Sequence, residues 1–171
     1  MMATIWLTGL PASGKTTIAY ALCSKLHKIQ KQAVVLDGDE LRQGLSADLG
    51  FSPQDRLEHI RRVGALACTL NGQGTHVIVS LISPYAQSRD EVRKAHQKKN
   101  RQFFEIFVDT PLQACIQRDP KGLYAKAASG SLKGLTGIDA PYEKPVAPDL
   151  TICTTAVSIE SAVEQLSAFC A

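Results

Sequence analysis

A glycine-rich segment near the start of the chain has the residues of a phosphate-binding loop. Residues 9–16 read Gly-Leu-Pro-Ala-Ser-Gly-Lys-Thr and fit the pattern G-x-x-x-x-G-K-[ST]. Glycines in such a loop let backbone N–H groups turn inward around phosphate oxygens. Lys15 would reach the β- and γ-phosphates, and the Thr16 hydroxyl would ligate Mg²⁺. This segment, called the phosphate loop below, predicts a site for a nucleoside triphosphate with Mg²⁺.

The phosphate loop alone does not separate the classes of protein that use nucleotides. A GTPase would carry an Asn-Lys-x-Asp guanine reader, which this sequence lacks. A motor ATPase would carry an apolar run that ends in paired acids, whereas residues 80–85 read Ser-Leu-Ile-Ser-Pro-Tyr. Acidic residues follow the second apolar run instead. This distribution indicates a kinase that phosphorylates a small molecule.

Two aspartates follow the second apolar run, in the turn Asp37-Gly38-Asp39. In open parallel sheets, ligands bind beyond the carboxyl ends of the strands, so both aspartates should face the acceptor substrate. Asp39 is predicted to orient the acceptor hydroxyl and to take its proton. Asp37 would hold Mg²⁺ through water or orient a neighbour. The alternative is a plain turn in which Asp39 caps the next helix.

Basic and aromatic side chains follow these aspartates along the chain, at Arg42, Phe51, Arg56 and His59. Arginine favours bidentate recognition of phosphate-like anions. A phenylalanine ring can stack on a nucleotide base. These residues therefore indicate an anionic substrate that carries a base, and the alternative is a solvated helix face with a core phenylalanine.

Apolar runs rich in β-branched residues alternate with stretches of helical period, which is typical of a parallel α/β sheet. The expected strands are residues 3–8, 33–36, 76–81, 103–108 and 150–153. The expected helices are residues 15–28, 57–70, 86–98, 112–118 and 158–169. The pattern thus predicts a parallel five-stranded sheet flanked by helices, with the phosphate loop between the first strand and the first helix.

Residues 119–148 interrupt this alternation and are rich in glycine, proline and lysine. An irregular segment of this length inside a compact domain is usually functional. We expect this lid segment to close over bound substrates, within a single domain that comprises residues 1–171.

The composition excludes several classes of protein. The chain has 171 residues, of which 44% are hydrophobic, and a net charge of +3. A nucleic-acid-binding protein usually shows a denser basic patch. Apolar runs such as residues 77–82 are far shorter than the ~20 residues of a membrane helix, and the first residues do not have the pattern expected of a signal peptide. We expect a cytoplasmic protein without nucleic-acid or membrane partners.

The five cysteines are scattered and form no C-x-x-C pair. They are expected to be small buried hydrophobic residues in a reducing compartment. A metal site or a redox switch is the alternative.

Eight blocks of residues together resemble the adenylyl-sulfate kinase (APS kinase) family. They are residues 9–17, 36–42, 48–52, 55–56, 60–62, 83–85, 118–124 and 136–143. The resemblance implies a P-loop nucleoside-triphosphate hydrolase fold with a lid. It also implies transfer of the ATP γ-phosphate to the 3′-hydroxyl of adenosine 5′-phosphosulfate (APS), which gives 3′-phosphoadenylyl sulfate in sulfate assimilation. A homodimer is implied as well.

The resemblance carries over residue by residue. The matching ATP contacts are Gly9, Leu10, Pro11, Ala12, Ser13, Gly14, Lys15, Thr16 and Thr17, with Arg118 at the base of the lid beside the ATP adenine. The matching acceptor contacts are Asp39 at the 3′-hydroxyl and the metal, Arg42, Arg56 and Lys121 at the phosphosulfate and ribose, Phe51 at the adenine, and Ile82 and Ser83 in the pocket wall. A direct in-line transfer needs no phosphoenzyme, so Ser83 is given no covalent role.

Two expected substrate contacts depart from the family pattern. His59 stands where the family generally has asparagine, and Leu135 stands where it usually has a second aromatic residue over the adenine. A leucine offers no π face, so weaker APS binding is expected. A protonated His59 would tighten APS binding as the pH falls, unless Arg56 lowers the pKa of the imidazole.

Two other functions compete with this one. The first is a P-loop kinase of another small hydroxyl compound, such as a sugar acid, which would have less use for Phe51 and Arg56. The second is a catalytically silent protein that binds nucleotide and regulates a partner in sulfate activation. The presence of Lys15, Thr16 and Asp39 argues against the silent protein.

Overall fold

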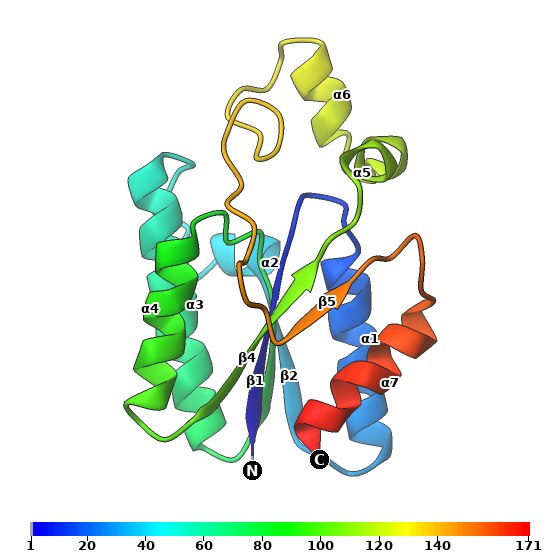
Figure 1. Ribbon diagram of the computed structural model, residues 1–171. Coiled ribbons are helices and arrows are strands. Elements are labelled where there is room, and N and C mark those ends of the chain that lie inside the picture. Colours follow the sequence, from blue (N-terminus) through cyan, green and yellow to red (C-terminus); the bar gives the residue numbers. More distant parts are fainter. Residues whose placement is uncertain (1) are drawn as a thin grey trace.

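A five-stranded sheet forms the centre of the structure, a computed structural model that describes residues 2–171 (Figure 1). The strands are β1 (Ala3–Thr8), β2 (Ala33–Asp37), β3 (His76–Ser80), β4 (Gln102–Val108) and β5 (Leu150–Ile152). They lie in the order β2-β3-β1-β4-β5, and every neighbouring pair is parallel. All residues of β1 and β3 are buried, because helices cover both faces of a parallel sheet. The predicted fold class is confirmed.

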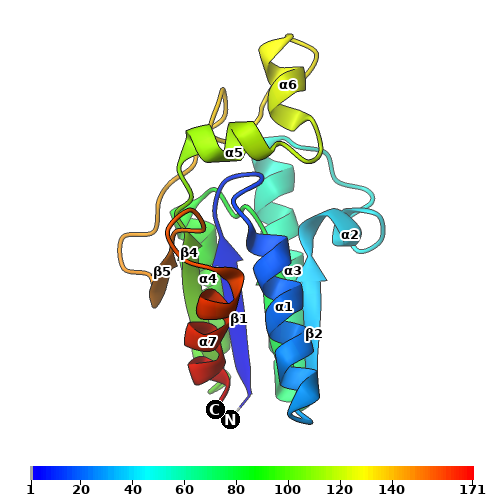
Figure 2. The same cartoon turned by 90° about the vertical axis from the view of Figure 1, so that its right-hand side faces the viewer.

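Helices α1 (Lys15–Lys28) and α7 (Ile159–Ser167) cover one face of the sheet (Figure 2). Their apolar residues pack against Ile5, Leu7 and Ile78 in one core cluster. The short 3₁₀ helix η1 (Ala168–Cys170) completes this layer. The apolar positions of α1 recur at helical spacing, so a helix that follows β1 directly buries its apolar side on the sheet.

Helices α3 (Pro53–Gly72) and α4 (Ala86–Gln97) cover the opposite face, where Trp6, Val77 and Val79 point. The two helices pack closely at Gly64. A Cβ atom built on Gly64 would lie 2.6 Å from a methyl carbon of Val92. Glycine is therefore needed there for close packing, although its φ angle is not unusual.

Two short helices were not predicted. Helix α2 (Gly38–Arg42) follows β2, and helix α6 (Leu123–Ala128) lies within the lid segment. Helix α3 also begins four residues earlier than expected, because the Ser52 side chain accepts a hydrogen bond from the backbone of Asp55 and Pro53 occupies the first turn. A polar first turn shows no apolar period, so the pattern hides it.

The lid segment and α5 (Leu112–Arg118) stand beyond the carboxyl ends of the strands (Figures 1 and 2). The start of β1 and the C-terminus lie at the opposite end of the sheet (Figure 1). Loops and short helices thus form the end at which the strands finish. Within residues 2–171, no helix is long and apolar enough to cross a membrane.

The five cysteines, all in the described part of the chain, are free thiols, and all except Cys153 are buried. Across residues 2–171, no group of three or more His, Cys, Asp or Glu side chains could hold a metal ion. Four of the cysteines thus lie where the sequence predicts them.

Candidate active site

The phosphate loop connects β1 to α1, and its glycines are needed for its path. Gly14 has a φ of 105°, in the left-handed region. A Cβ atom on Gly9 would lie 2.6 Å from the carbonyl oxygen of Val108 on β4. A side chain at Gly9 would therefore clash with β4, and one at Gly14 would strain the backbone.

Lys15 is folded onto its own loop. Its Nζ donates hydrogen bonds to the carbonyl oxygens of Gly9 and Leu10, at 2.9 and 2.7 Å, and to Ser13 Oγ at 3.3 Å. The side chain is 7% exposed, and this burial lowers the pKa of Lys15 to about 7. The amine is positioned to exchange these carbonyls for phosphate oxygens.

Oxygen atoms suited to Mg²⁺ lie next to the phosphate loop. Thr16 Oγ1 donates to Asp37 Oδ2 at 2.8 Å and lies 3.1 Å from Ser80 Oγ. Hard divalent cations such as Mg²⁺ prefer carboxylate and hydroxyl oxygens, so this donor set fits the ion. Asp37 also accepts a hydrogen bond from the backbone N–H of Asp39 at 3.0 Å and so caps α2.

Asp39 lies in the first turn of α2, but it is not the cap of that helix, because Asp37 has this role. The Asp39 carboxylate instead forms an ion pair with Lys121 from the lid segment. Both side chains are more than half exposed. The capping alternative for Asp39 is therefore wrong, and the carboxylate and the lid lysine meet across the pocket.

Phe51 is not a core residue. Its ring is 69% exposed, and the Arg42 guanidinium lies 4.4 Å from the ring centroid. Arg42 Nη1 also donates to the carbonyl oxygen of Gly50 at 2.7 Å. The arginine thus holds an exposed aromatic ring at the pocket, where a base can stack on it.

Arg56 connects the start of α3 to the lid segment. Its Nη1 donates to Thr136 Oγ1 and its Nη2 to the Gly134 carbonyl oxygen, both at 2.6 Å. Its Nε donates to the carbonyl oxygen of Phe51 at 2.9 Å. The Arg56 side chain therefore contacts both the backbone of Phe51 and the lid segment.

His59 is buried and neutral. Its Nδ1 lies 2.8 Å from Ser46 Oγ, and within residues 2–171 its Nε2 has no hydrogen-bond partner. Burial, with the nearby charges of Arg42 and Arg62, lowers the pKa of His59 to about 4. In the free protein, His59 is therefore neutral near pH 6, which matches the alternative of a lowered pKa, although burial rather than Arg56 is the main cause.

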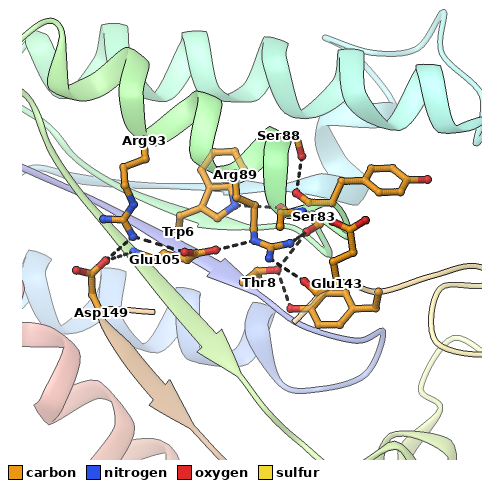
Figure 3. Close-up of polar contacts among 12 residues, drawn as sticks. Trp6, Thr8, Ser83, Ser88, Arg89, Arg93, Glu105, Glu143 and Asp149 are labelled. Atoms are coloured by element: carbon orange, nitrogen blue, oxygen red, sulfur yellow. Dashed lines mark hydrogen bonds and ion pairs between the residues drawn. The ribbon is translucent and has the colours of Figure 1, made fainter. Parts of the chain in front are cut away.

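Ser83 has a φ of 48°, which is unusual for a residue other than glycine. Its Oγ accepts a hydrogen bond from Trp6 Nε1 at 3.0 Å, and its carbonyl oxygen accepts one from Arg89 at 2.6 Å (Figure 3). Ser83 is only 2% exposed. These contacts give its hydroxyl and its carbonyl oxygen structural partners.

Arg118, at the end of α5, binds the segment that follows β5. Its Nη1 donates to Thr154 Oγ1 at 2.7 Å, and Thr154 Oγ1 donates to the Ser13 carbonyl oxygen at 3.0 Å. Thr110 Oγ1 donates to the same carbonyl oxygen at 2.8 Å. The sequence analysis missed Thr154 and Thr110, although both follow the carboxyl end of a strand, which is the available signal.

A pocket of about 600 Å³ brings most of the predicted residues together. Those that line it are Pro11, Ala12, Ser13, Gly14, Lys15, Thr16, Thr17, Asp37, Asp39, Arg42, Phe51, Arg56, His59, Ile82, Ser83, Arg118 and Lys121. The lining of one cavity thus includes most of the phosphate loop, the strand-end aspartates, and Phe51 with its neighbouring arginines.

Three predicted residues are not among those that line the pocket. Gly9 lies beneath the loop against β4. Leu10 and Leu135 pack in a small apolar cluster with Cys115 and Tyr124, called the lid cluster below, where Leu135 is 7% exposed. The expectation that Leu135 lies over the adenine is not met in this structure, because its side chain fills the junction between α5, α6 and the phosphate loop.

Comparisons with known proteins identify one family. A family model described as "Adenylylsulphate kinase" matches residues 1–153. An adenylyl-sulfate kinase from Staphylococcus haemolyticus is 46% identical over 162 residues, which are 95% of this chain and 80% of that relative. The bifunctional enzyme NodQ of Azospirillum brasilense is 46% identical over 96% of this chain, but the chain spans only 26% of that relative's length.

A solved structure of an APS kinase is also similar to this chain. The Mycobacterium tuberculosis APS kinase CysC, in complex with AMPPNP and APS, has a TM-score of 0.95 and is 46% identical. The match covers 98% of this chain and 96% of that chain. The sheet, the phosphate loop and the surrounding helices therefore have the same arrangement in both proteins.

Proposed function

The chain belongs to the adenylylsulphate kinase family and is an ATP-dependent kinase, and we propose how its pocket carries out the reaction. The γ-phosphate of ATP passes to the 3′-hydroxyl of adenosine 5′-phosphosulfate, giving ADP and 3′-phosphoadenylyl sulfate. The observation that carries this proposal is the single pocket, which contains both the phosphate loop and the exposed Phe51 ring with its arginines.

The donor half of the pocket is proposed to hold the ATP phosphates. Lys15 leaves its three loop acceptors and donates to the β- and γ-phosphate oxygens, where its charge stabilises the transferring group. Thr16 and Asp37 would hold Mg²⁺, which neutralises charge on the phosphates when bound. Arg118 would lie beside the ATP adenine, supported by its place at the base of the lid.

The acceptor half is proposed to hold APS. The exposed Phe51 ring stacks on the adenine, and Arg42, Arg56 and Lys121 bind the anionic phosphosulfate end. Arg56 and Lys121 are already in contact with other protein groups, so both must exchange these partners for substrate oxygens.

Asp39 is proposed to orient the 3′-hydroxyl and to accept its proton during transfer. Its carboxylate is paired with Lys121 before substrate arrives. Entry of APS gives Lys121 an anionic partner of its own, which frees Asp39 for the hydroxyl. The negative charge of APS thus releases Asp39 from Lys121, so that Asp39 can accept the proton of the 3′-hydroxyl.

Further proposals have the same basis. We propose that residues 1–171 act as one domain whose lid segment closes over both substrates, supported by the lid's contacts with Asp39 and Arg56. The family resemblance further supports a homodimer, and the free, mostly buried cysteines support a place in the reducing cytoplasm.

The test is to mix the protein with ATP, Mg²⁺ and APS and to measure ADP together with 3′-phosphorylated product. Gluconate and AMP replace APS in two control reactions. We expect turnover with APS and little with either control. Turnover with gluconate alone would indicate a sugar-acid kinase, and nucleotide binding without turnover would indicate a silent regulator.

A further inference from the structure

A single buried guanidinium joins the Ser83 segment, which lines the pocket, to the backbone of Glu143 in the lid segment. Arg89 on α4 is 2% exposed, and its Nη1 donates to the Ser83 carbonyl oxygen at 2.6 Å. Its Nη2 donates to the Glu143 carbonyl oxygen at 2.7 Å, and its Nε donates to Glu105 Oε1 at 2.6 Å (Figure 3). The planar fork thus bridges the pocket wall, the end of the lid segment and strand β4.

The Ser83 contact matters because the backbone there is strained. A non-glycine residue keeps a positive φ angle only where its surroundings hold it. Trp6 donates a hydrogen bond to the Ser83 hydroxyl, and Arg89 donates one to the Ser83 carbonyl oxygen. The backbone conformation of Ser83 in the pocket wall therefore depends on Trp6 and Arg89.

The lid segment is attached to the same loop. The backbone N–H of Glu143 donates to the Pro84 carbonyl oxygen at 2.8 Å, and the Glu143 carboxylate accepts from the N–H of Ala86 at 2.7 Å. The Tyr142 hydroxyl lies 2.9 Å from Thr8 Oγ1. This end of the lid is thus anchored by hydrogen bonds, and Arg89 joins it to the pocket wall at Ser83.

A buried arginine is costly unless every donor has a partner, and hydrophobic side chains can often replace such an ion pair without loss of stability. Packing alone therefore does not account for Arg89. What a hydrophobic residue could not do is hold two carbonyl oxygens and one carboxylate at fixed angles.

We propose that Arg89 is a positioning residue for the acceptor substrate. It holds the backbones of Ser83 and Glu143 in a fixed arrangement. The acceptor half of the pocket is thereby preformed, and the lid segment closes over it in a defined position. This proposal rests on the proposed function and adds a residue outside the pocket to it.

The test compares Arg89→Lys with Arg93→Lys. Arg93 lies one turn further along α4 and binds Glu105 at 3.5 Å and Asp149 at 2.8 Å, on the side away from Ser83 and Glu143 (Figure 3). Lysine at position 89 keeps the charge beside Glu105 but loses the fork geometry. We expect Arg89→Lys to raise the KM for APS about tenfold or more, with a smaller effect on kcat. The Kd for a non-hydrolysable ATP analogue should stay within about twofold of the parent value, because the phosphate loop does not contact Arg89.

Trp6 supplies a second readout, since it is the one tryptophan in the chain and donates to Ser83 Oγ. In Arg89→Lys the released Ser83 should weaken this hydrogen bond, and the tryptophan emission should shift to shorter wavelength. Arg93→Lys should leave the emission, the KM for APS and the ATP-analogue affinity close to parent values.

If Arg89→Lys does not fold, Glu105→Gln weakens the hold on Arg89 without changing shape, and it should raise the KM for APS by a smaller factor. The proposal is overturned if folded Arg89 or Glu105 variants lower the melting temperature but keep the parent KM and the parent tryptophan emission. A parent protein that does not phosphorylate APS contradicts the proposed function instead, and the tryptophan readout still tests the positioning of Ser83.

Discussion

At the scale of single residues, the site depends on charged groups that already have protein partners. Lys15 binds carbonyl oxygens of its own loop, and Asp39 binds Lys121. Lys15 is buried and Asp39 is more than half exposed, but both are bound to protein groups, so each must exchange a partner when substrate enters. Such exchange costs less than ordering a flexible side chain, since the geometry is prepared.

The first prediction concerns Asp39. Asp39→Asn keeps the shape of the side chain but removes its capacity to accept a proton, so kcat should fall by about 10²-fold or more. Binding of an ATP analogue should be retained. The control is Glu40→Gln, which changes a neighbouring carboxylate on α2 that accepts a hydrogen bond from Tyr20 at 2.7 Å. Near-parent turnover in Asp39→Asn would show that another group takes the proton.

The second prediction concerns the protonation of Lys15. Burial lowers its pKa to about 7 in the free protein, whereas bound phosphates would raise it by their negative charge. Between pH 7 and the raised value, ATP binding should take up about one proton, so the affinity should fall as the pH rises from 7 to 9. Calorimetry at pH 8 in buffers with different ionisation enthalpies measures this uptake.

Lys15→Arg is the control for this experiment, because a guanidinium stays charged throughout this pH range. Its nucleotide binding should show no such uptake. Equal binding heats in all buffers for the parent protein would mean that Lys15 is already charged in the free state.

At the scale of elements, the lid segment is fastened at several points. Tyr124 of α6 donates through its hydroxyl to the Pro11 carbonyl oxygen at 2.9 Å, and Arg56 binds Gly134 and Thr136. Residues 128–131, between these fastenings, are exposed. We therefore expect one part of the lid segment to be more accessible than its two ends.

The third prediction is that trypsin cuts the free protein at Lys126 and Lys133, which are exposed. An ATP analogue together with APS should slow both cuts, because the closed lid binds both ligands. Cleavage after Lys98 and Lys99, which lie in the turn before β4, is the internal control and should not change. Equal cleavage at Lys126 with and without ligands would contradict lid closure.

The fourth prediction concerns Leu135 in the lid cluster. A phenylalanine at this buried position would overfill the space beside Cys115 and Tyr124, and such overpacking typically costs about 1–3 kcal/mol. Leu135→Phe should therefore loosen the lid and leave the KM for APS unchanged or raised. Ile138→Phe changes an exposed position in the same segment and should behave like the parent. A lower KM in Leu135→Phe would place this residue at the adenine after all.

At the scale of the whole molecule, buried histidines link the fold to pH. His59, His76 and His96 are buried, and burial lowers the pKa of each. In the unfolded chain a histidine takes up a proton near pH 6.5, whereas His59 in the folded protein does so only near pH 4. The unfolded state thus binds more protons in this window, so acid favours unfolding.

The fifth prediction is that the free energy of unfolding falls as the pH drops from about 6.5 to about 4. His59 should account for at most about 3 kcal/mol of this loss, by the conversion of 1.36 kcal/mol for each unit of pKa. Urea unfolding of the parent and of His59→Asn at pH 7 and pH 4.5 measures it. The variant should lose less stability between the two pH values, and parallel losses would contradict a buried neutral His59.

The strands and the helices with strong apolar period could be predicted from the sequence. Helices α1 and α5 and strand β1 have the predicted bounds, because burial against the sheet imposes a regular spacing that remains legible in the chain. Helices α2 and α6 have five and six residues, too few for a period to appear. Their positions depend on the contacts of Asp37 and Tyr124 with other parts of the structure.

The same distinction holds for the site. The phosphate loop is contiguous, so its residue types and spacing determined its place and its chemistry. Arg89, Thr154 and Leu135 take their roles from partners far away in the chain, such as Ser13 for Thr154 and Glu143 for Arg89. Such partners cannot be predicted from the local sequence, because these side chains meet only where the strand order and the lid contacts bring them together. The tertiary structure alone decided that Leu135 packs inside the lid cluster, that His59 stays neutral, and that Asp39 faces Lys121.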